Sequence, residues 1–205
     1  MLVIGTWLKN DCSDSTQYGV ASAPARIEYR ILQQERESTM TSTSKLLEGG
    51  CTCGHVRYQL RSDPLIVHCC HCLWCQRQTG SAFAINALFV ANEVELLKGE
   101  VKAEMVDSPS GRGQRIARCP KCDIAVWSNY FMGGIREGVR FLRVGTLDVP
   151  NQLPPDVHIY TSTKQSWVQL PDDAHVEESF YDYETTWTPE NLVRLQALRD
   201  AARTT

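Results

Sequence analysis

Short runs of apolar residues, separated by turn-forming residues, dominate the chain from Gly49 onward. The runs are four to nine residues long, are rich in Val, Ile, Phe and Tyr, and are bounded by Gly, Pro, Asn, Asp or Ser. They read HVRYQL, PLIVH, AFAINALFV, VELL, IAVWSNYF, VRFLRVGTL and VHIYTS. Runs of this length and composition are typical of strands in antiparallel sheets. The pattern therefore predicts a mainly β domain.

The two ends of the chain differ from this pattern. Residues 1–45 mix Ser, Thr, Asp and Gln, so we expect an extension that is poorly ordered or loosely docked, and Met40 leaves open a shorter product that starts there. Near the other end, Thr188 as N-cap, Pro189 as first helical residue and Leu192 at helical spacing predict a helix. We therefore divide the chain into an extension (1–45), a β domain (46–185) and a C-terminal helix with its tail (186–205).

Composition and charge argue against two classes of partner. The chain carries 21 Lys and Arg against 24 Asp and Glu, a formal net charge of -3, so a surface built for nucleic-acid phosphates is not expected. No apolar run approaches the roughly eighteen residues of a membrane span, and the start of the chain lacks the pattern of a secretory signal. We therefore expect an intracellular, cytoplasmic protein without a membrane partner, and the sequence leaves its oligomeric state open.

The nine cysteines of the chain point to metal rather than to disulfides, because a reducing cytosol disfavours disulfide bonds. Cys12 and Cys69 stand apart from the others. The remaining seven form two pairs and one triple: Cys51 with Cys53, Cys119 with Cys122, and Cys70 with Cys72 and Cys75. Zinc takes four ligands in a tetrahedral site, so two pairs can close one site whereas a triple leaves one position open. This counting predicts two zinc ions per chain.

The two cysteine pairs are candidates for one structural zinc. Cys119-Pro-Lys-Cys122 has the spacing of a tight turn that aims two thiolates at one ion, and Cys51 and Cys53 can share one face of an extended segment. Such a site would join segments that are separated by 65 residues (54–118). Its binding energy would stabilise the fold by several kcal/mol. Two unrelated buried pairs are the alternative.

The triple of Cys70, Cys72 and Cys75 is the candidate reactive site. His68, His71 or no residue of the chain could complete it. In an extended backbone, His71 would point away from the neighbouring cysteines, whereas His68 would lie on the face of Cys70. A site with three cysteines and one histidine would be structural, whereas an open position would accept water or a substrate thiol.

Five segments resemble, in order and approximate spacing, the glutathione-dependent formaldehyde-activating enzyme family, which also includes centromere protein V. They are GGCTCGHVRYQL, CHCLWCQRQTGSAF, RCPKC, VGTLD and PPDVHIYTSTKQSW, and they cover residues 49 to about 170. The resemblance implies a mainly β fold of the Mss4-like type. It also implies a structural zinc on Cys51, Cys53, Cys119 and Cys122, and a second zinc, where glutathione and the aldehyde meet, on Cys70, Cys72 and Cys75.

The chain departs from the family at one position in these segments. Asp123 follows Cys122, where the family commonly has Gly. Asp tolerates a positive φ less well than Gly but better than most residues. We therefore expect the structural site to be preserved.

The resemblance implies a zinc-dependent carbon–sulfur lyase, which adds glutathione or another thiol reversibly to formaldehyde or a related electrophile. Three thiolates make zinc a weak Lewis acid, and such a zinc suits the binding of one more thiol, which loses its proton on coordination. The alternatives are the same chemistry on a different thiol or electrophile, and a non-catalytic zinc-binding interaction module of the centromere protein V type. Basic and acidic residues are balanced in residues 1–45, which argues against a chromatin-binding tail.

Glutathione carries two carboxylates, so its site needs cations and hydrogen-bond donors. Arg77 is the cation nearest to the triple along the chain, and Thr79 and Ser81 are candidate donors beside it. Further candidate cations are Arg112, Arg115 and Arg118. Solvated surface charges and an ordinary turn before a strand are the alternatives. Trp74 and Phe83 could line the cavity or belong to the core.

Overall fold

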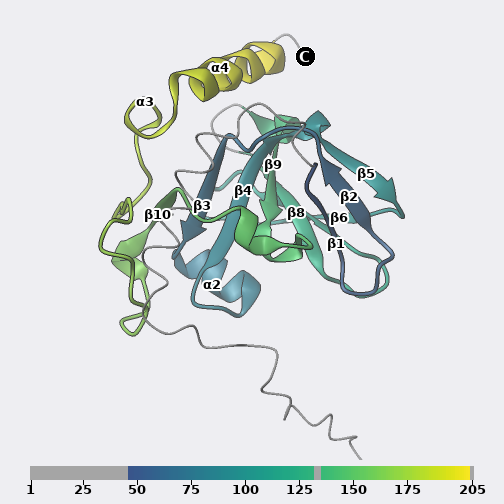
Figure 1. Ribbon diagram of the computed structural model, residues 1–205, viewed down its shortest axis with the longest axis horizontal. Coiled ribbons are helices and arrows are strands. Elements are labelled where there is room, and N and C mark those ends of the chain that lie inside the picture. The colour runs from purple at the N-terminus through teal and green to yellow at the C-terminus, as the bar shows by residue number, and fades with distance from the viewer. Residues whose placement is uncertain (1–45, 132–134, 204–205) are drawn as a thin grey trace, which may run out of the picture. The chain divides into compact units, whose positions relative to one another are not determined.

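Two β-sheets make up most of the described structure (Figure 1). A computed structural model describes residues 46–131 and 135–203. The expectations for residues 1–45, including the start at Met40, lie outside these ranges. The mainly β fold expected from the sequence is confirmed. Among the described residues, no helix has the length and apolar character to cross a membrane.

The smaller sheet has three antiparallel strands in the order β1-β2-β5. The larger sheet has seven strands in the order β10-β3-β4-β9-β8-β7-β6, and its neighbours are antiparallel except that β10 runs parallel to β3. The strands are β1 (Glu48–Gly50), β2 (Arg57–Leu60), β3 (Ile66–Cys70), β4 (Ala84–Val90), β5 (Val94–Lys98), β6 (Lys102–Val106), β7 (Gln114–Arg118), β8 (Ala125–Tyr130), β9 (Val139–Arg143) and β10 (Val157–Ile159).

The central strands of the larger sheet are buried on both faces. One face of β3 and β4 contributes Val67 and Phe89 to a core shared with Tyr58 and Leu60 of the smaller sheet. Because β3 is covered on both sides, its residues form a continuous apolar run rather than an alternating one. This burial explains why the sequence pattern predicts these strands well.

The C-terminal segment packs against apolar residues from the other face of the larger sheet. It contains α3 (Tyr183–Thr186) and α4 (Pro189–Arg203). The backbone N–H of Asn191 donates to Oγ1 of Thr188 at 3.2 Å, so Thr188 caps α4 as the sequence predicts. Leu195 and Trp187 are buried in a second apolar cluster together with Leu88 of β4. The expected C-terminal helix is thus confirmed, and it packs on the same body as the sheets.

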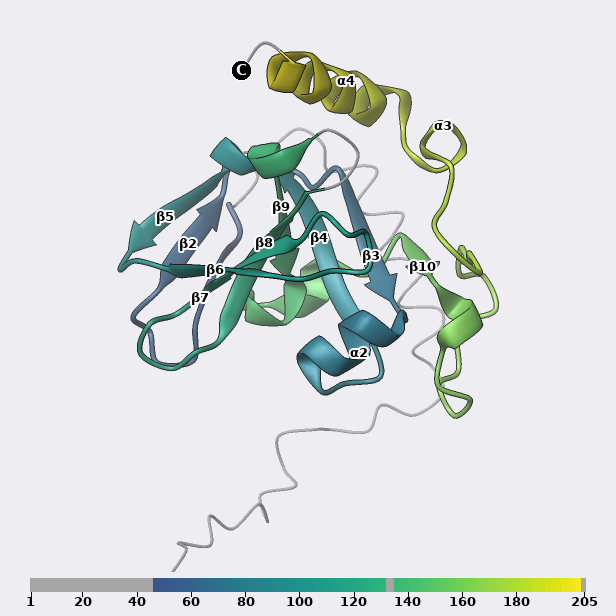
Figure 2. The ribbon, with the colours of Figure 1, turned by 180° about the vertical axis from the view of Figure 1, so that it is seen from behind.

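The remaining helix, α2 (Leu73–Thr79), starts directly after the second cysteine of the triple. It lies at the opposite end of the sheets from α4, as both views show (Figures 1 and 2). The backbone N–H of Cys75 donates to Sγ of Cys72, which caps the helix, and Gly80 ends it in a left-handed conformation with φ 67°. Short 3-10 helices are Ala91–Glu93, Arg136–Gly138, Val144–Thr146, Pro150–Gln152 and Thr161–Thr163.

Candidate active site

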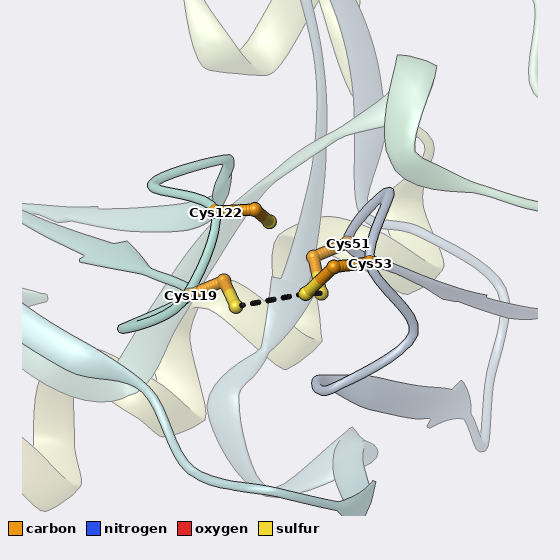
Figure 3. A group of neighbouring side chains, drawn as sticks. All are labelled: Cys51, Cys53, Cys119 and Cys122. Atoms are coloured by element: carbon orange, nitrogen blue, oxygen red, sulfur yellow. Dashed lines mark hydrogen bonds between the residues drawn. The ribbon is translucent and has the colours of Figure 1, made fainter.

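The four cysteines of the two pairs come together from two turns (Figure 3). Their sulfur atoms all lie within 4.8 Å of one another, with 3.5 Å between Cys51 and Cys53 and 3.7 Å between Cys53 and Cys119. In a tetrahedral site with zinc–sulfur bonds of about 2.3 Å, neighbouring sulfur atoms are about 3.8 Å apart. This donor set therefore fits zinc. Cys51 and Cys53 approach through a turn, closed by the N–H of Gly54 on the carbonyl of Cys51 at 3.0 Å, and not along an extended segment as expected.

Backbone N–H groups point at the sulfur atoms of this site. The N–H of Val56 donates to Sγ of Cys51 at 3.2 Å, and the N–H of Lys121 donates to Sγ of Cys119 at 3.4 Å. Burial raises the pKa of the Cys51 thiol, but the N–H of Val56 and the neighbouring thiols outweigh it and lower the pKa to about 6. Such donors favour thiolates, which are the form that binds zinc.

Asp123 adopts a left-handed backbone conformation, which glycine takes at little cost. Its φ is 59°, in the left-handed region. The N–H of Asp123 donates to the carbonyl of Cys119 at 3.0 Å, and Nη1 of Arg118 donates to the carbonyl of Asp123 at 2.9 Å. These bonds hold the turn that carries Cys122, so the substitution of Gly by Asp is compatible with the four-cysteine geometry.

The triple is assembled where β3 passes into α2. Cys70 ends the strand, Cys72 caps the helix and Cys75 lies in its first turn. Their three sulfur atoms lie within 4.8 Å of one another. Hydrogen bonds from the thiols of Cys70 and Cys75 lower the pKa of Cys72 to about 3. The pKa of Cys70 is raised, because its thiol bonds to Cys72 and Cys75. Cys72 is therefore the first of the three to become a thiolate, and three sulfur donors suit zinc.

His68 lies close to the triple but is engaged elsewhere. Its Nε2 is 2.6 Å from the hydroxyl of Tyr181, and that hydroxyl accepts a hydrogen bond from Nε1 of Trp187 at 2.8 Å. Burial lowers the pKa of His68 to about 3, so the ring is neutral. Among the described residues, no histidine or carboxylate joins the three sulfur atoms within 4.8 Å. The described residues therefore supply no fourth ligand beside the triple.

His71 points to the opposite side, as the extended backbone predicts. It lies with Cys69 and His158, and the distances from its Nε2 are 3.5 Å to Sγ of Cys69 and 3.1 Å to Nδ1 of His158. If Nε2 of His71 bound a metal, the neutral ring would carry its proton on Nδ1, which is buried without a partner. An unpaired buried donor costs about 1–3 kcal/mol. Nδ1 is equally without a partner when Nε2 of His71 bonds to His158, so this cost does not separate a hydrogen-bonded pair from a third metal site.

A cavity of about 540 Å³ opens beside the triple. Cys70, Cys72 and Cys75 line it together with aromatic side chains, among them Trp74 and Tyr160. Trp74 thus belongs to the wall, whereas Phe83 packs against His71 with 5.4 Å between ring centroids.

Tyr160 holds an uncommon backbone conformation at the cavity wall. Its φ is 56°, a conformation that costs a non-glycine residue about 1–3 kcal/mol. The N–H of Tyr160 donates to the carbonyl of Ser179 at 2.9 Å, and its ring contacts that of Phe180. The C-terminal segment therefore holds part of the cavity wall in place.

The candidate substrate-binding residues from the sequence lie outside the cavity wall. Arg77 is exposed on α2, and Thr79 and Ser81 are exposed at its end. The hydroxyl of Thr79 donates to the carbonyl of Cys75 at 2.8 Å, so it stabilises the helix end. Contacts of these three residues with a substrate stay a prediction. The other candidates, Arg112, Arg115 and Arg118, do not line the cavity either.

Arg143 is the cavity cation that the sequence did not single out. It ends β9, is 9% exposed and lines the cavity. Its Nη1 donates to Oδ1 of Asn86 at 2.7 Å and its Nη2 to Oε1 of Gln78 at 2.8 Å. One signal was present in the sequence: an arginine stands inside the apolar run VRFLRVGTL, where a charged side chain needs a partner.

Comparison with known proteins decides the family. The profile of the family described as "Glutathione-dependent formaldehyde-activating enzyme" matches residues 46–163, which is more than half of the chain. The chain belongs to this family. The matched residues include both cysteine sites of this chain and Arg143, and they end before Tyr181 and Trp187.

Individual relatives were also found. A Halomonas elongata protein named "Putative glutathione-dependent formaldehyde-activating enzyme" is 30% identical over 132 residues, which are 61% of this chain and 81% of that protein. A crystal structure of a Rhodobacter sphaeroides protein aligns with a TM-score of 0.38 and 18% identity, over 49% of this chain and 87% of that one.

Proposed function

We propose that the chain is a zinc-dependent carbon–sulfur lyase that adds glutathione, or another thiol, reversibly to formaldehyde or a related electrophile. The observation that carries this proposal is the cavity of about 540 Å³ beside three cysteine sulfur atoms that lack a fourth ligand from the described chain. A purely structural zinc would be closed by a fourth ligand and would need no such cavity. In the proposal, Cys70, Cys72 and Cys75 hold the reactive zinc, and Cys51, Cys53, Cys119 and Cys122 hold a structural one.

The residues of the chain would hold the reactants in place. When bound, zinc supplies a position at which a thiol is held as thiolate at neutral pH. In the overall addition, the thiol S–H bond would break, a C–S bond would form at the carbonyl carbon, and the proton lost by the thiol would end on the former carbonyl oxygen, so that no oxidant or reductant is needed. Trp74 and Tyr160 line the cavity, and the Tyr160 hydroxyl, which bonds to no described residue, is a candidate donor to the aldehyde oxygen.

The free cysteines of the two sites fit a reducing compartment. We therefore place the reaction in the cytoplasm, where a glutathione pool keeps thiols reduced. A free thiol and an aldehyde are the partners in this proposal. Neither a nucleic acid nor a membrane is required.

The proposal is tested by the rate of S-(hydroxymethyl)glutathione formation, measured by NMR exchange between formaldehyde and glutathione. Zinc-loaded wild type should exceed the uncatalysed rate. Cys72→Ser should lose one zinc ion and fall to the uncatalysed rate, whereas Cys69→Ser, which changes the neighbouring buried cysteine on the other face, should keep both zinc ions and the rate. A Cys72→Ser variant that retains two zinc ions and full activity would contradict the assignment. Wild type at the uncatalysed rate would indicate a different substrate or an interaction module.

A further inference from the structure

Arg143 is a buried cation whose nearby anionic groups among the described residues are the thiolates of Cys70 and Cys75 rather than carboxylates. Its two hydrogen bonds go to Asn86 and Gln78, which are neutral amides. No Asp or Glu of the described chain pairs with it, although buried charges in proteins are normally paired. The position therefore suits an anion that comes from outside the chain.

The guanidinium of Arg143 is fixed in place and has donors to spare. Arg143 and Asn86 are direct partners in the pairing of β9 with β4, and the bonds to Asn86 and Gln78 hold the terminal nitrogens. A guanidinium carries five N–H groups, and these two bonds use two of them. None of the described hydrogen bonds joins Arg143 to a sulfur atom of the triple. The remaining donors are thus available to a ligand beside the triple and are not consumed by its thiolates.

Apart from the three cysteines, the charged groups of the cavity wall also favour an anion beside Arg143. Among the described residues that line the cavity, Arg143 is the one with a permanent positive charge, and none is Asp or Glu. His68 lines it as well, but its ring bonds to Tyr181 and is neutral. A carboxylate that enters this cavity would meet a guanidinium and no opposing carboxylate.

We propose that Arg143 binds a carboxylate of the thiol substrate and thereby makes the site select acidic thiols over neutral ones. This inference rests on the proposed function, because the same cavity must hold the thiol. The planar guanidinium matches a carboxylate with two parallel hydrogen bonds. A neutral thiol of the same size would leave Arg143 buried and unpaired, so the site discriminates against it. Arg77, nearest to the triple in sequence, is the competing candidate for this role.

The test uses S-methylglutathione and its dimethyl ester, which differ in carboxylate charge and cannot form a thiolate. Calorimetry with zinc-loaded wild type should show the acid binding roughly 10- to 100-fold tighter than the ester, as expected for hydrogen bonds to a charged group. Arg143→Gln should remove this difference by weakening the acid alone. Arg61→Gln, which changes an exposed arginine paired with Glu95 on the smaller sheet, should leave both affinities unchanged.

Several results would overturn the assignment. Equal affinity of wild type for the acid and the ester would show that no carboxylate is bound, and this comparison requires no folded variant. Equal weakening of both ligands by Arg143→Gln would show that Arg143 serves the cysteine centre or the fold. Loss of the difference in Arg77→Gln, with none in Arg143→Gln, would transfer the role to Arg77. Because neither ligand reacts, these results are independent of whether formaldehyde is the electrophile.

Discussion

Tyr181→Phe should destabilise the protein, because one hydroxyl joins the C-terminal segment to the cavity wall. The hydroxyl lies 2.6 Å from Nε2 of His68 and 2.8 Å from Nε1 of Trp187. His68 is 2% exposed, and Tyr181 and Trp187 are each 5% exposed. The substitution leaves two buried polar groups unpaired, and each such group costs about 1–3 kcal/mol. We expect a loss of about 2–4 kcal/mol in the free energy of unfolding, since water can replace part of the lost bonding.

The matched control for this prediction is Tyr183→Phe. Tyr183 lies in the same aromatic cluster, with its ring centroid 5.5 Å from that of Tyr181, but its hydroxyl bonds to no described residue. Its loss should change the stability by less than about 0.5 kcal/mol. Urea unfolding at constant zinc concentration gives both values, provided that the slopes agree. If the two variants unfold at the same urea concentration, the hydrogen-bonded link from Trp187 to His68 is not a source of stability.

Two further predictions concern the four-cysteine site and His68. Replacing Cys119 and Cys122 together by Ser should reduce the zinc content from two ions to one and lower the unfolding temperature. The reason is that the site joins segments 66 residues apart, and such a cross-link is worth about 4 kcal/mol in chain entropy. Metal analysis and calorimetry would contradict this prediction if neither the zinc content nor the unfolding temperature changed. Because burial lowers the pKa of His68 to about 3, its protonation is shifted to lower pH and the ring should stay neutral from pH 8 to pH 5. A titration of the His68 ring resonances near pH 6.5, measured by NMR, would be the opposite result.

Most of the strands that the sequence predicts have apolar residues buried on one or both faces, whereas β5 was predicted although its Leu96 and Leu97 are exposed. β1, β6 and β7 were not predicted, because β1 is three residues long, β6 is an exposed edge strand and β7 carries Arg115 and Arg118 among its five residues. The helix α2 was not predicted either. Its start depends on a bond between the N–H of Cys75 and the sulfur of Cys72, and a thiol is not a usual helix cap.

The candidate site was predictable where it depends on local spacing and not where it depends on strand pairing. The cysteine groups are close in sequence, so their spacing is informative. Arg77 was chosen because it is two residues from Cys75, but on a helix residues two apart face different sides. Arg143 is far from the triple in sequence and reaches the cavity because β9 pairs with β4. That register cannot be read from the sequence alone, and neither can the contact of Tyr181 with His68.

In the proposed reaction, the metal held by the three-cysteine centre binds a substrate thiol. The most direct test replaces zinc by cobalt(II), whose absorption responds to thiolate ligands, and follows the spectrum during a titration with glutathione. We expect glutathione to produce a new thiolate-to-cobalt absorption in wild type. We expect no new absorption in Cys72→Ser, and none in wild type when S-methylglutathione replaces glutathione. A wild-type spectrum that glutathione leaves unchanged would contradict the proposed reaction.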